Sequence, residues 1–297
     1  MTNSPKTVHF LPELEAATGK FDFPMTNDYM FRAVLQSNNK ALTGLISSLL
    51  HIPPEDISSV EVTNPIILGD ACQDKEMRLD INVALNNHSL INLEMQVDRK
   101  DNWTERSLAY LCGNFNNLSE GQNYEDIPPV IHIGILDFTL FKDEPEFYAT
   151  NKLINIRTHK IYSDKFTLHV LELKHTELAT EEDKAWGIDH WAKLFKATIW
   201  EELRMIAQNN EYMAEAANSI FRMNADDMAR KRCRDREEHY RELRGLKKKI
   251  EEKDAQIEEQ AVKIEELGTE NEEQASKIEE LAAEIARLQK QLESGNK

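Results

Sequence analysis

Hydrophobic positions between Pro24 and Leu50 recur at a helical spacing. They are Met30, Phe31, Val34 and Leu35, followed by Leu42, Leu45, Ile46, Leu49 and Leu50. A period of three to four residues is typical of amphipathic helices. The pattern predicts two short helices, with a break near residues 37–39 and an end at residues 51–54, which include two prolines. Thr26 or Asn27 is the expected N-cap of the first helix.

The next segment changes to the alternating pattern that is typical of strands. Residues 57–68 are rich in Val and Ile, and residues 77–85 and 90–97 alternate apolar and polar side chains. Residues 86–89 form a turn signal, so the last two strands are expected to make a hairpin. The remaining predicted elements are a helix over residues 101–120, an apolar strand near the sheet centre over residues 129–141, and a strand over residues 166–173.

Helical spacing returns after about residue 180 and becomes a seven-residue repeat at the end of the chain. The repeat predicts a coiled coil, with Ile at one core position and Leu at the other favouring a parallel dimer. Polar residues at three of the core positions leave the stoichiometry open, and a single charged helix in solution is the alternative. The first core positions are Leu243, Ile250, Ile257, Ile264, Asn271, Ile278, Ile285 and Leu292, and the second are Leu246, Lys253, Gln260, Leu267, Gln274, Leu281 and Leu288.

These patterns divide the chain into four predicted parts. Residues 1–25 form a poorly ordered arm, residues 26–178 an α/β core, residues 179–240 a helical subdomain, and residues 241–294 the coiled coil. No run of about 18 apolar residues and no secretory signal pattern occurs, so a cytoplasmic protein is expected. Cys72, Cys112 and Cys233 are scattered, which argues against a disulfide framework or a zinc site.

The charge of the chain bears on its partners. The formal net charge is −17, and residues 1–230 hold 21 basic and 35 acidic residues. Nucleic-acid binders are usually basic, so this balance argues against a simple one. A bound divalent cation or a local basic strip can offset the acidity. Residues 230–249 form such a strip, with 10 basic and 4 acidic residues, although a solvated helix face is the alternative interpretation.

The candidate chemistry lies in the predicted hairpin. Asp80 and Glu94 place one acid on each of two adjacent strands, a pair that can chelate Mg²⁺. A three-residue loop, with Leu85 opposite Ser89, puts the two acids directly across from each other, whereas a four-residue loop separates them. We therefore predict an odd-length loop or a bulge, with Asn87 or His88 in the left-handed conformation. Acid pairs also arise by chance on the wet face of a sheet.

Several motifs around this pair occur in an order that resembles a known family. They are NDYMF, KEMRLDI, NLEMQ, ERSLAYL and EGQNYEDIPPVIHIGILDF. Together they resemble the Rpn-type recombination-promoting nucleases and related transposases of the PD-(D/E)XK nuclease superfamily, over roughly residues 26–175. The resemblance implies a restriction-endonuclease-like core of helix, three strands, helix and strand, and it implies Mg²⁺- or Mn²⁺-dependent cleavage of DNA.

The resemblance also assigns roles to residues of this chain. Asp80 matches the first metal-binding acid, Glu94 matches the acid of the (D/E)XK triplet, and the backbone carbonyl of Met95 is a further metal ligand. Gln96 stands where the superfamily usually has Lys; a neutral amide cannot stabilise charge on the phosphate, but it can orient the attacking water. The accessory candidates are Asp28, whose alternative role is helix capping, and Arg106 and Tyr110, whose alternative roles are an ion pair and core packing.

Two functions follow from this interpretation. The first is a metal-dependent DNA endonuclease that promotes recombination or the movement of mobile elements. The second is a catalytically weak or inactive nuclease fold that serves as an oligomeric DNA-binding scaffold. The Asp80–Glu94 pair favours the first, whereas the acidic body and Gln96 favour the second. No Walker-type glycine-rich loop occurs, which argues against an ATPase.

Overall fold

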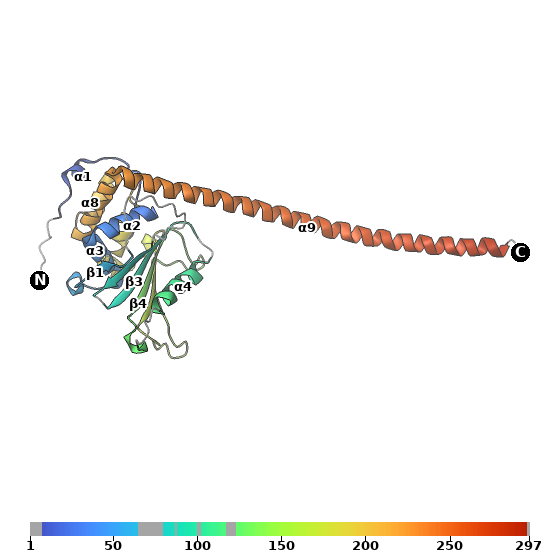
Figure 1. Cartoon of the computed structure of the whole chain (residues 1–297), viewed down its shortest axis with the longest axis horizontal. Coiled ribbons are helices and arrows are strands. Elements are labelled where there is room, and N and C mark those ends of the chain that lie inside the picture. The colour runs from blue at the N-terminus through green and yellow to red at the C-terminus, as the bar shows by residue number, and fades with distance from the viewer. Residues whose placement is uncertain (1–7, 65–79, 87, 100–101, 117–122, 296–297) are drawn as a thin grey trace. The chain divides into compact units, whose positions relative to one another are not determined.

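The computed structural model describes residues 8–64, 80–86, 88–99, 102–116 and 123–295. Its contacts group the chain into two units, Met1–Glu237 and Glu238–Lys297. The first unit is a mixed α/β fold built on a six-stranded sheet, and the second is the greater part of one long helix. Figure 1 labels the elements.

The sheet has the strand order β1-β2-β3-β4-β6-β5. Neighbouring strands β3, β4 and β6 are parallel, and the other pairs are antiparallel. β4 lies in the interior of the sheet, as its apolar sequence predicted. The strands are β1 (Val60–Val62), β2 (Ile81–Leu85), β3 (Ser89–Gln96), β4 (Val130–Leu136), β5 (Tyr148–Lys152) and β6 (Phe166–Glu172).

The β2–β3 hairpin has the predicted register. Leu85 pairs with Ser89, which leaves a three-residue loop. In the described part of this loop, Asn86 has a positive φ, at 53°, and His88 does not. Asn87 lies outside the described residues, so the prediction of a left-handed residue at Asn87 or His88 stays a prediction. Asn86 takes the turn position because its side chain accepts hydrogen bonds from the backbone N–H groups of Ser58 and Ser59, at 2.8 and 3.2 Å.

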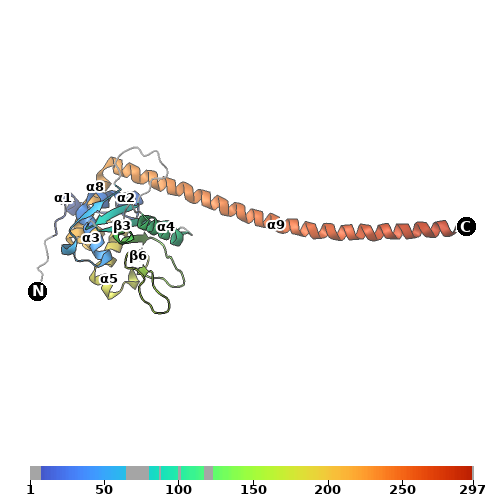
Figure 2. The ribbon, with the colours of Figure 1, turned by 60° about the horizontal axis from the view of Figure 1, so that its bottom comes forward.

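Helices cover both faces of the sheet. In Figure 2, α3 and α4 lie on opposite sides of β3. The first predicted helical region forms α2 and α3, with the break at Asn38, and the side chains of Asn27 and Asn38 cap the two helices. The helices of the first unit are α1 (Pro12–Ala16), α2 (Asp28–Ser37), α3 (Asn39–Leu50), α4 (Trp103–Phe115), α5 (Glu181–Ala185), α6 (Ile188–Lys196), α7 (Trp200–Ala207) and α8 (Glu211–Ala225), with short 3-10 turns η1 (Pro54–Asp56), η2 (Tyr124–Asp126) and η3 (Thr176–Leu178).

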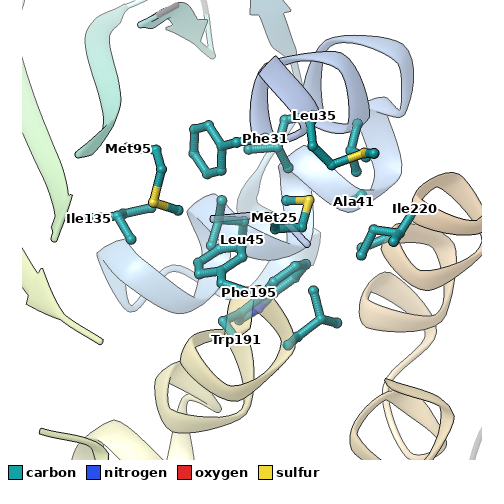
Figure 3. Packing of buried hydrophobic residues seen from close by; sticks show 14 of the residues in the cluster. Met25, Phe31, Leu35, Ala41, Leu45, Met95, Ile135, Trp191, Phe195 and Ile220 are labelled. Atoms are coloured by element: carbon teal, nitrogen blue, oxygen red, sulfur yellow. The ribbon is translucent and has the colours of Figure 1, made fainter. Parts of the chain in front are cut away.

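The larger core lies between the sheet and α2, α3, α6 and α8. Met95 of β3 and Ile135 of β4 point towards Phe31 of α2 and Leu45 of α3 (Figure 3). Because strand side chains alternate, the neighbours of Met95 along β3 point to the opposite face, which α4 covers. The larger core therefore fixes the position of the strand that carries Glu94 and Gln96.

The N-terminal segment is more ordered than predicted from residue 8 onwards. It contains α1, whose Leu14 is fully buried. Asn218 of α8 ties the segment down: its amide oxygen accepts from the backbone N–H of Leu11 at 2.9 Å, and its amide nitrogen donates to the carbonyl of His9 at 3.0 Å. These partners are more than 200 positions apart, so no local pattern indicates the contact.

The strand predictions need two further corrections. Of the strand expected over residues 57–68, the described part forms only β1, and residues 65–68 lie outside the described ranges. β5 was not predicted, because its sequence YATNK lacks an apolar alternation. It is an edge strand paired only with β6, and an edge strand with exposed side chains needs no such pattern.

The chain ends in α9 (Asp227–Gly295), a helix of 69 residues. In the part of α9 that belongs to the second unit, the described apolar residues of the seven-residue repeat are exposed. Ile264 is 70% exposed and Ile278 is 67% exposed. Within the part of the chain that the structure describes, no helix combines the length and the apolar character of a membrane span.

Candidate active site

The register of the hairpin, extended by one position, aligns Asp80 with Glu94. The last described pair is Ile81 with Leu93, so Asp80 lies one position further along the register, opposite Glu94. Side chains directly opposite each other have Cβ atoms roughly 5 Å apart in an antiparallel pair. Both acids are buried, with 9% and 5% of their surface exposed. Glu94 lies on the sheet face that α4 covers, and the extended register puts Asp80 opposite it.

Gly134 allows α4 to lie close to Glu94. Gly134 of β4 is the register partner of Glu94. A Cβ at this position would lie 2.3 Å from the ring of Trp103, the first residue of α4. The glycine therefore makes room for the indole, and the first turns of α4 run directly over the acid.

Arg106 of α4 contacts Glu94. Its Nε donates to Oε1 of Glu94 at 3.1 Å. Its guanidinium carbon lies 4.9 Å from the ring centroid of Tyr110, in the range of cation–π interactions. Arg106 thus makes the ion pair that was its alternative role, Tyr110 packs beside it, and their accessory role stays a hypothesis.

A buried polar strip continues from the acids along the same face. Asn92 pairs with Asn82 in the ladder, and its amide nitrogen donates to the amide oxygen of Asn82 at 2.7 Å. His132 of β4 is the other register partner of Asn92 and is stacked against Tyr110. Burial lowers the pKa of His132 to about 4, and the nearby charge of Arg106 adds to the effect. His132 is therefore neutral near pH 7.

Gln96 and Met95 follow Glu94 on β3. The amide nitrogen of Gln96 donates to the carbonyl of Asp98 at 2.9 Å, and the side chain is buried. Met95 points into the larger core, so only its backbone can serve the site. Asp80 directly precedes β2, and Glu94 and the backbone of Met95 belong to β3.

Asp28 pairs with an arginine from the start of α9. Nη2 of Arg236 lies 2.5 Å from Oδ2 of Asp28, and Nε lies 3.2 Å from both carboxylate oxygens. Capping of α2 falls to the preceding residue, Asn27, whose side chain accepts from the backbone N–H of Met30. The geometry assigns Asp28 to an ion pair and leaves its accessory role a hypothesis.

Two residues at the site were missed in the sequence. Arg32 of α2 donates from Nη1 to the carbonyl of Asp80 and from Nη2 to the carbonyl of Asn64. The amide nitrogen of Asn64 also donates to the carbonyl of Asp80, at 3.1 Å. An arginine inside a helical apolar pattern is typical of a solvent-facing position, so the pattern gave no sign of this contact.

The donor set fits a hard divalent cation. Carboxylate and carbonyl oxygens are the ligands of Mg²⁺ and Mn²⁺, and Mg²⁺ is commonly held by one or two carboxylates together with substrate phosphate and water. Among the described residues, no group of three or more His, Cys, Asp or Glu side chains could hold a metal ion.

Comparison with known proteins identifies the family. Searches of curated proteins and of solved structures found no match to the chain. The family model described as PD-(D/E)XK nuclease family transposase matches residues 25–249, which include the whole sheet, α4 and both acids. The chain belongs to the PD-(D/E)XK nuclease family of transposases.

Proposed function

We propose that the protein is a metal-dependent DNA endonuclease whose site is the Asp80–Glu94 pair. The observation that carries the proposal is the hairpin register, because a one-residue shift would place Asp80 across from Met95. Membership of a nuclease family supports DNA as the substrate. The transposase description of that family supports a role in recombination or in the movement of mobile elements.

Asp80, Glu94 and the backbone carbonyl of Met95 would hold Mg²⁺ or Mn²⁺. The bound ion supplies Lewis-acid chemistry, because it neutralises charge on the scissile phosphate and makes a water molecule acidic enough to attack. The chain itself positions the two acids. The backbone of Glu94 is held in the sheet by β4, and the backbone of Asp80 is held by hydrogen bonds from Arg32 and Asn64.

Arg106 supplies the positive charge that Gln96 lacks. A lysine at position 96 would bring a cation to the phosphate, whereas the Gln96 amide is held by the carbonyl of Asp98. The guanidinium of Arg106 lies beside Glu94 and is partly exposed, at 31% of its side-chain surface. A planar guanidinium binds phosphate oxygens through two parallel hydrogen bonds. Gln96 then holds the end of β3 through its hydrogen bond to Asp98, and its amide oxygen orients the attacking water.

The second unit forms a parallel coiled coil that joins copies of the chain. The supporting observation is the exposed apolar seam of α9, in which the residues at the first core position share one helix face. A single helix with such a seam would leave its hydrophobic side chains in water. Asn271 at a first core position favours two strands, so a dimer is the expected form.

Plasmid cleavage tests the proposed site. Purified full-length protein is incubated with supercoiled plasmid and Mg²⁺, Mn²⁺ or EDTA, beside Asp80→Asn and Glu94→Gln. We expect nicking that requires the metal and that falls by roughly 100-fold or more in each variant, because each removes a ligand of an ion worth several kcal/mol. Glu61→Gln is the matched control, since Glu61 is an exposed acid on β1 of the same sheet.

Two outcomes would contradict the proposal. Full activity in Asp80→Asn or Glu94→Gln would remove the pair from the reaction. Absence of cleavage by the folded wild-type protein with every metal would favour the scaffold function. Circular dichroism of each variant shows whether a loss of activity reflects a loss of structure.

A further inference from the structure

We propose that Arg32 is a positioning residue that fixes Asp80 in the orientation required for metal binding. The inference rests on the proposed function, since it concerns the same site. It goes beyond that function because it states that Arg32 of α2, 48 positions away in the sequence, sets the orientation of Asp80.

Arg32 is buried in a place where a charge is costly. It has no exposed surface, and it lies on α2 among apolar residues of the larger core. Moving an arginine out of water costs several kcal/mol unless hydrogen bonds compensate. Burial lowers the pKa of Arg32 to about 10, and the charge of Asp80 opposes the shift, so the guanidinium remains protonated at neutral pH. A methionine would fill the same volume without this cost, so stability alone does not explain an arginine here.

The partners of Arg32 lie next to the last described pair of the β2–β3 ladder. Among the described residues the β2–β3 ladder ends at Ile81 with Leu93, and Asp80 follows it. The carbonyl of Asp80 instead accepts from Arg32 and from the amide of Asn64. Asn64 is in turn fixed, because its amide oxygen accepts from the backbone N–H of Asn82 at 2.8 Å. These contacts fix the peptide group of Asp80.

The mode of contact keeps the carboxylate available. Arg32 donates to the backbone carbonyl of Asp80, and among the described residues no donor to its side-chain oxygens is found. A guanidinium can bridge two carbonyls because its donors form a rigid fork. The fork joins Asp80 to Asn64, and Nε donates to Gln36 at 3.2 Å. The arginine thus orients Asp80 without occupying the oxygens that a cation needs.

Isothermal titration of Mn²⁺ into the full-length protein tests the inference without reference to cleavage. Arg32→Lys keeps the charge but lacks the rigid planar fork that holds the two carbonyls in a fixed geometry. We expect its Mn²⁺ dissociation constant to rise about 10-fold or more, as is typical when a residue that orients a metal ligand is changed. Asn64→Ala removes the second donor to the same carbonyl, and we expect a rise in the same direction. Gln36→Ala is the matched control, because it removes a contact of Arg32 that does not reach Asp80, and its affinity should equal that of the wild type.

Titrations are made at a temperature well below the midpoint of each variant's thermal unfolding. A lower affinity for Mn²⁺ then does not reflect unfolding of the variant. If Arg32→Lys does not fold, Asn64→Ala decides the question. Wild-type affinity in the folded Arg32→Lys and Asn64→Ala variants would overturn the role of Arg32 while the nuclease site stands. Absence of Mn²⁺ binding by the wild type, or binding that survives Asp80→Asn, would instead overturn the proposed function.

Discussion

His132 is a buried histidine one strand away from Glu94, and it has an unusual electrostatic position. Neither ring nitrogen has a hydrogen-bond partner in the described part of the chain. The ring is enclosed by Tyr110 and Trp103. A charged imidazolium there would lose its hydration and face Arg106, which explains why the pKa is lowered to about 4.

This position makes stability depend on pH. Between the ordinary pKa of about 6.5 and the folded value, the unfolded chain binds a proton that the folded chain does not, so stability falls as pH falls. Urea unfolding should show a loss from this residue of about 2 kcal/mol between pH 7 and pH 5. His132→Phe should remove that part of the loss and keep the ring stack. An unchanged pH dependence in this variant would contradict the neutral, buried state of His132.

At the level of residues, the sequence predicted the hairpin register that aligns Asp80 with Glu94, but it did not predict the residues that contact Asp80. Asp80 and Glu94 belong to recognisable sequence motifs. Their alignment across the hairpin depends on the length of the loop between β2 and β3, which the turn residues constrain. Arg32 and Asn64 carry no such signal, because their contacts depend on where α2 and the chain before the hairpin meet in space. A lone buried arginine has no period or spacing that distinguishes it from a solvated one.

At the level of elements, the first turns of α9 belong to the fold of the first unit. Ala229 and Cys233 are buried in the larger core, and the amide of Asn27 donates to the carbonyl of Cys233 at 3.2 Å. Arg236 pairs with Asp28 at the start of α2, and Arg32 lies one turn further along that helix. The start of α9 thus holds the helix that positions Asp80.

Breaking this ion pair should be costly. Arg236→Ala leaves the Asp28 carboxylate buried without its arginine, and we expect a loss of roughly 3 kcal/mol in the free energy of unfolding. Asp28→Asn in the Arg236→Ala background removes the uncompensated charge and should recover part of the loss. Urea unfolding of the two variants measures both effects. Equal stability of Arg236→Ala and wild type would show that the pair does not anchor α2.

Elements with a strong hydrophobic period were predictable, and elements held by distant contacts were not. α2, α3, β3 and β4 bury continuous apolar faces, so their patterns persist in the sequence. β5 is an exposed edge strand, and α1 is docked by Asn218, so neither needs a pattern of its own. The left-handed conformation of Asn86 was not predicted, because Asn86, Asn87 and His88 all tolerate a turn and the anchoring of Asn86 by residues before β1 leaves no local signal.

For the whole molecule, the seam of α9 is where the proposed oligomer can be tested. Ile264→Lys with Ile278→Lys places charges at two core positions, and we expect a dimer in the wild type and a monomer in this variant by sedimentation equilibrium. Val262→Lys is the matched control, because Val262 is also an exposed apolar residue of α9, but it lies off the seam. Dissociation by both variants, or by neither, would contradict the proposed register.

The central claim is that Asp80 and Glu94 act together on one metal ion, and a double-mutant cycle of plasmid nicking tests it most directly. Nicking rates are measured in Mn²⁺ for Asp80→Asn, Glu94→Gln and the double variant. Groups that act as a unit give strongly non-additive losses, so the double variant should be no slower than the worse single variant. Losses that multiply would show that the two carboxylates act independently, and the shared metal site would have to be abandoned.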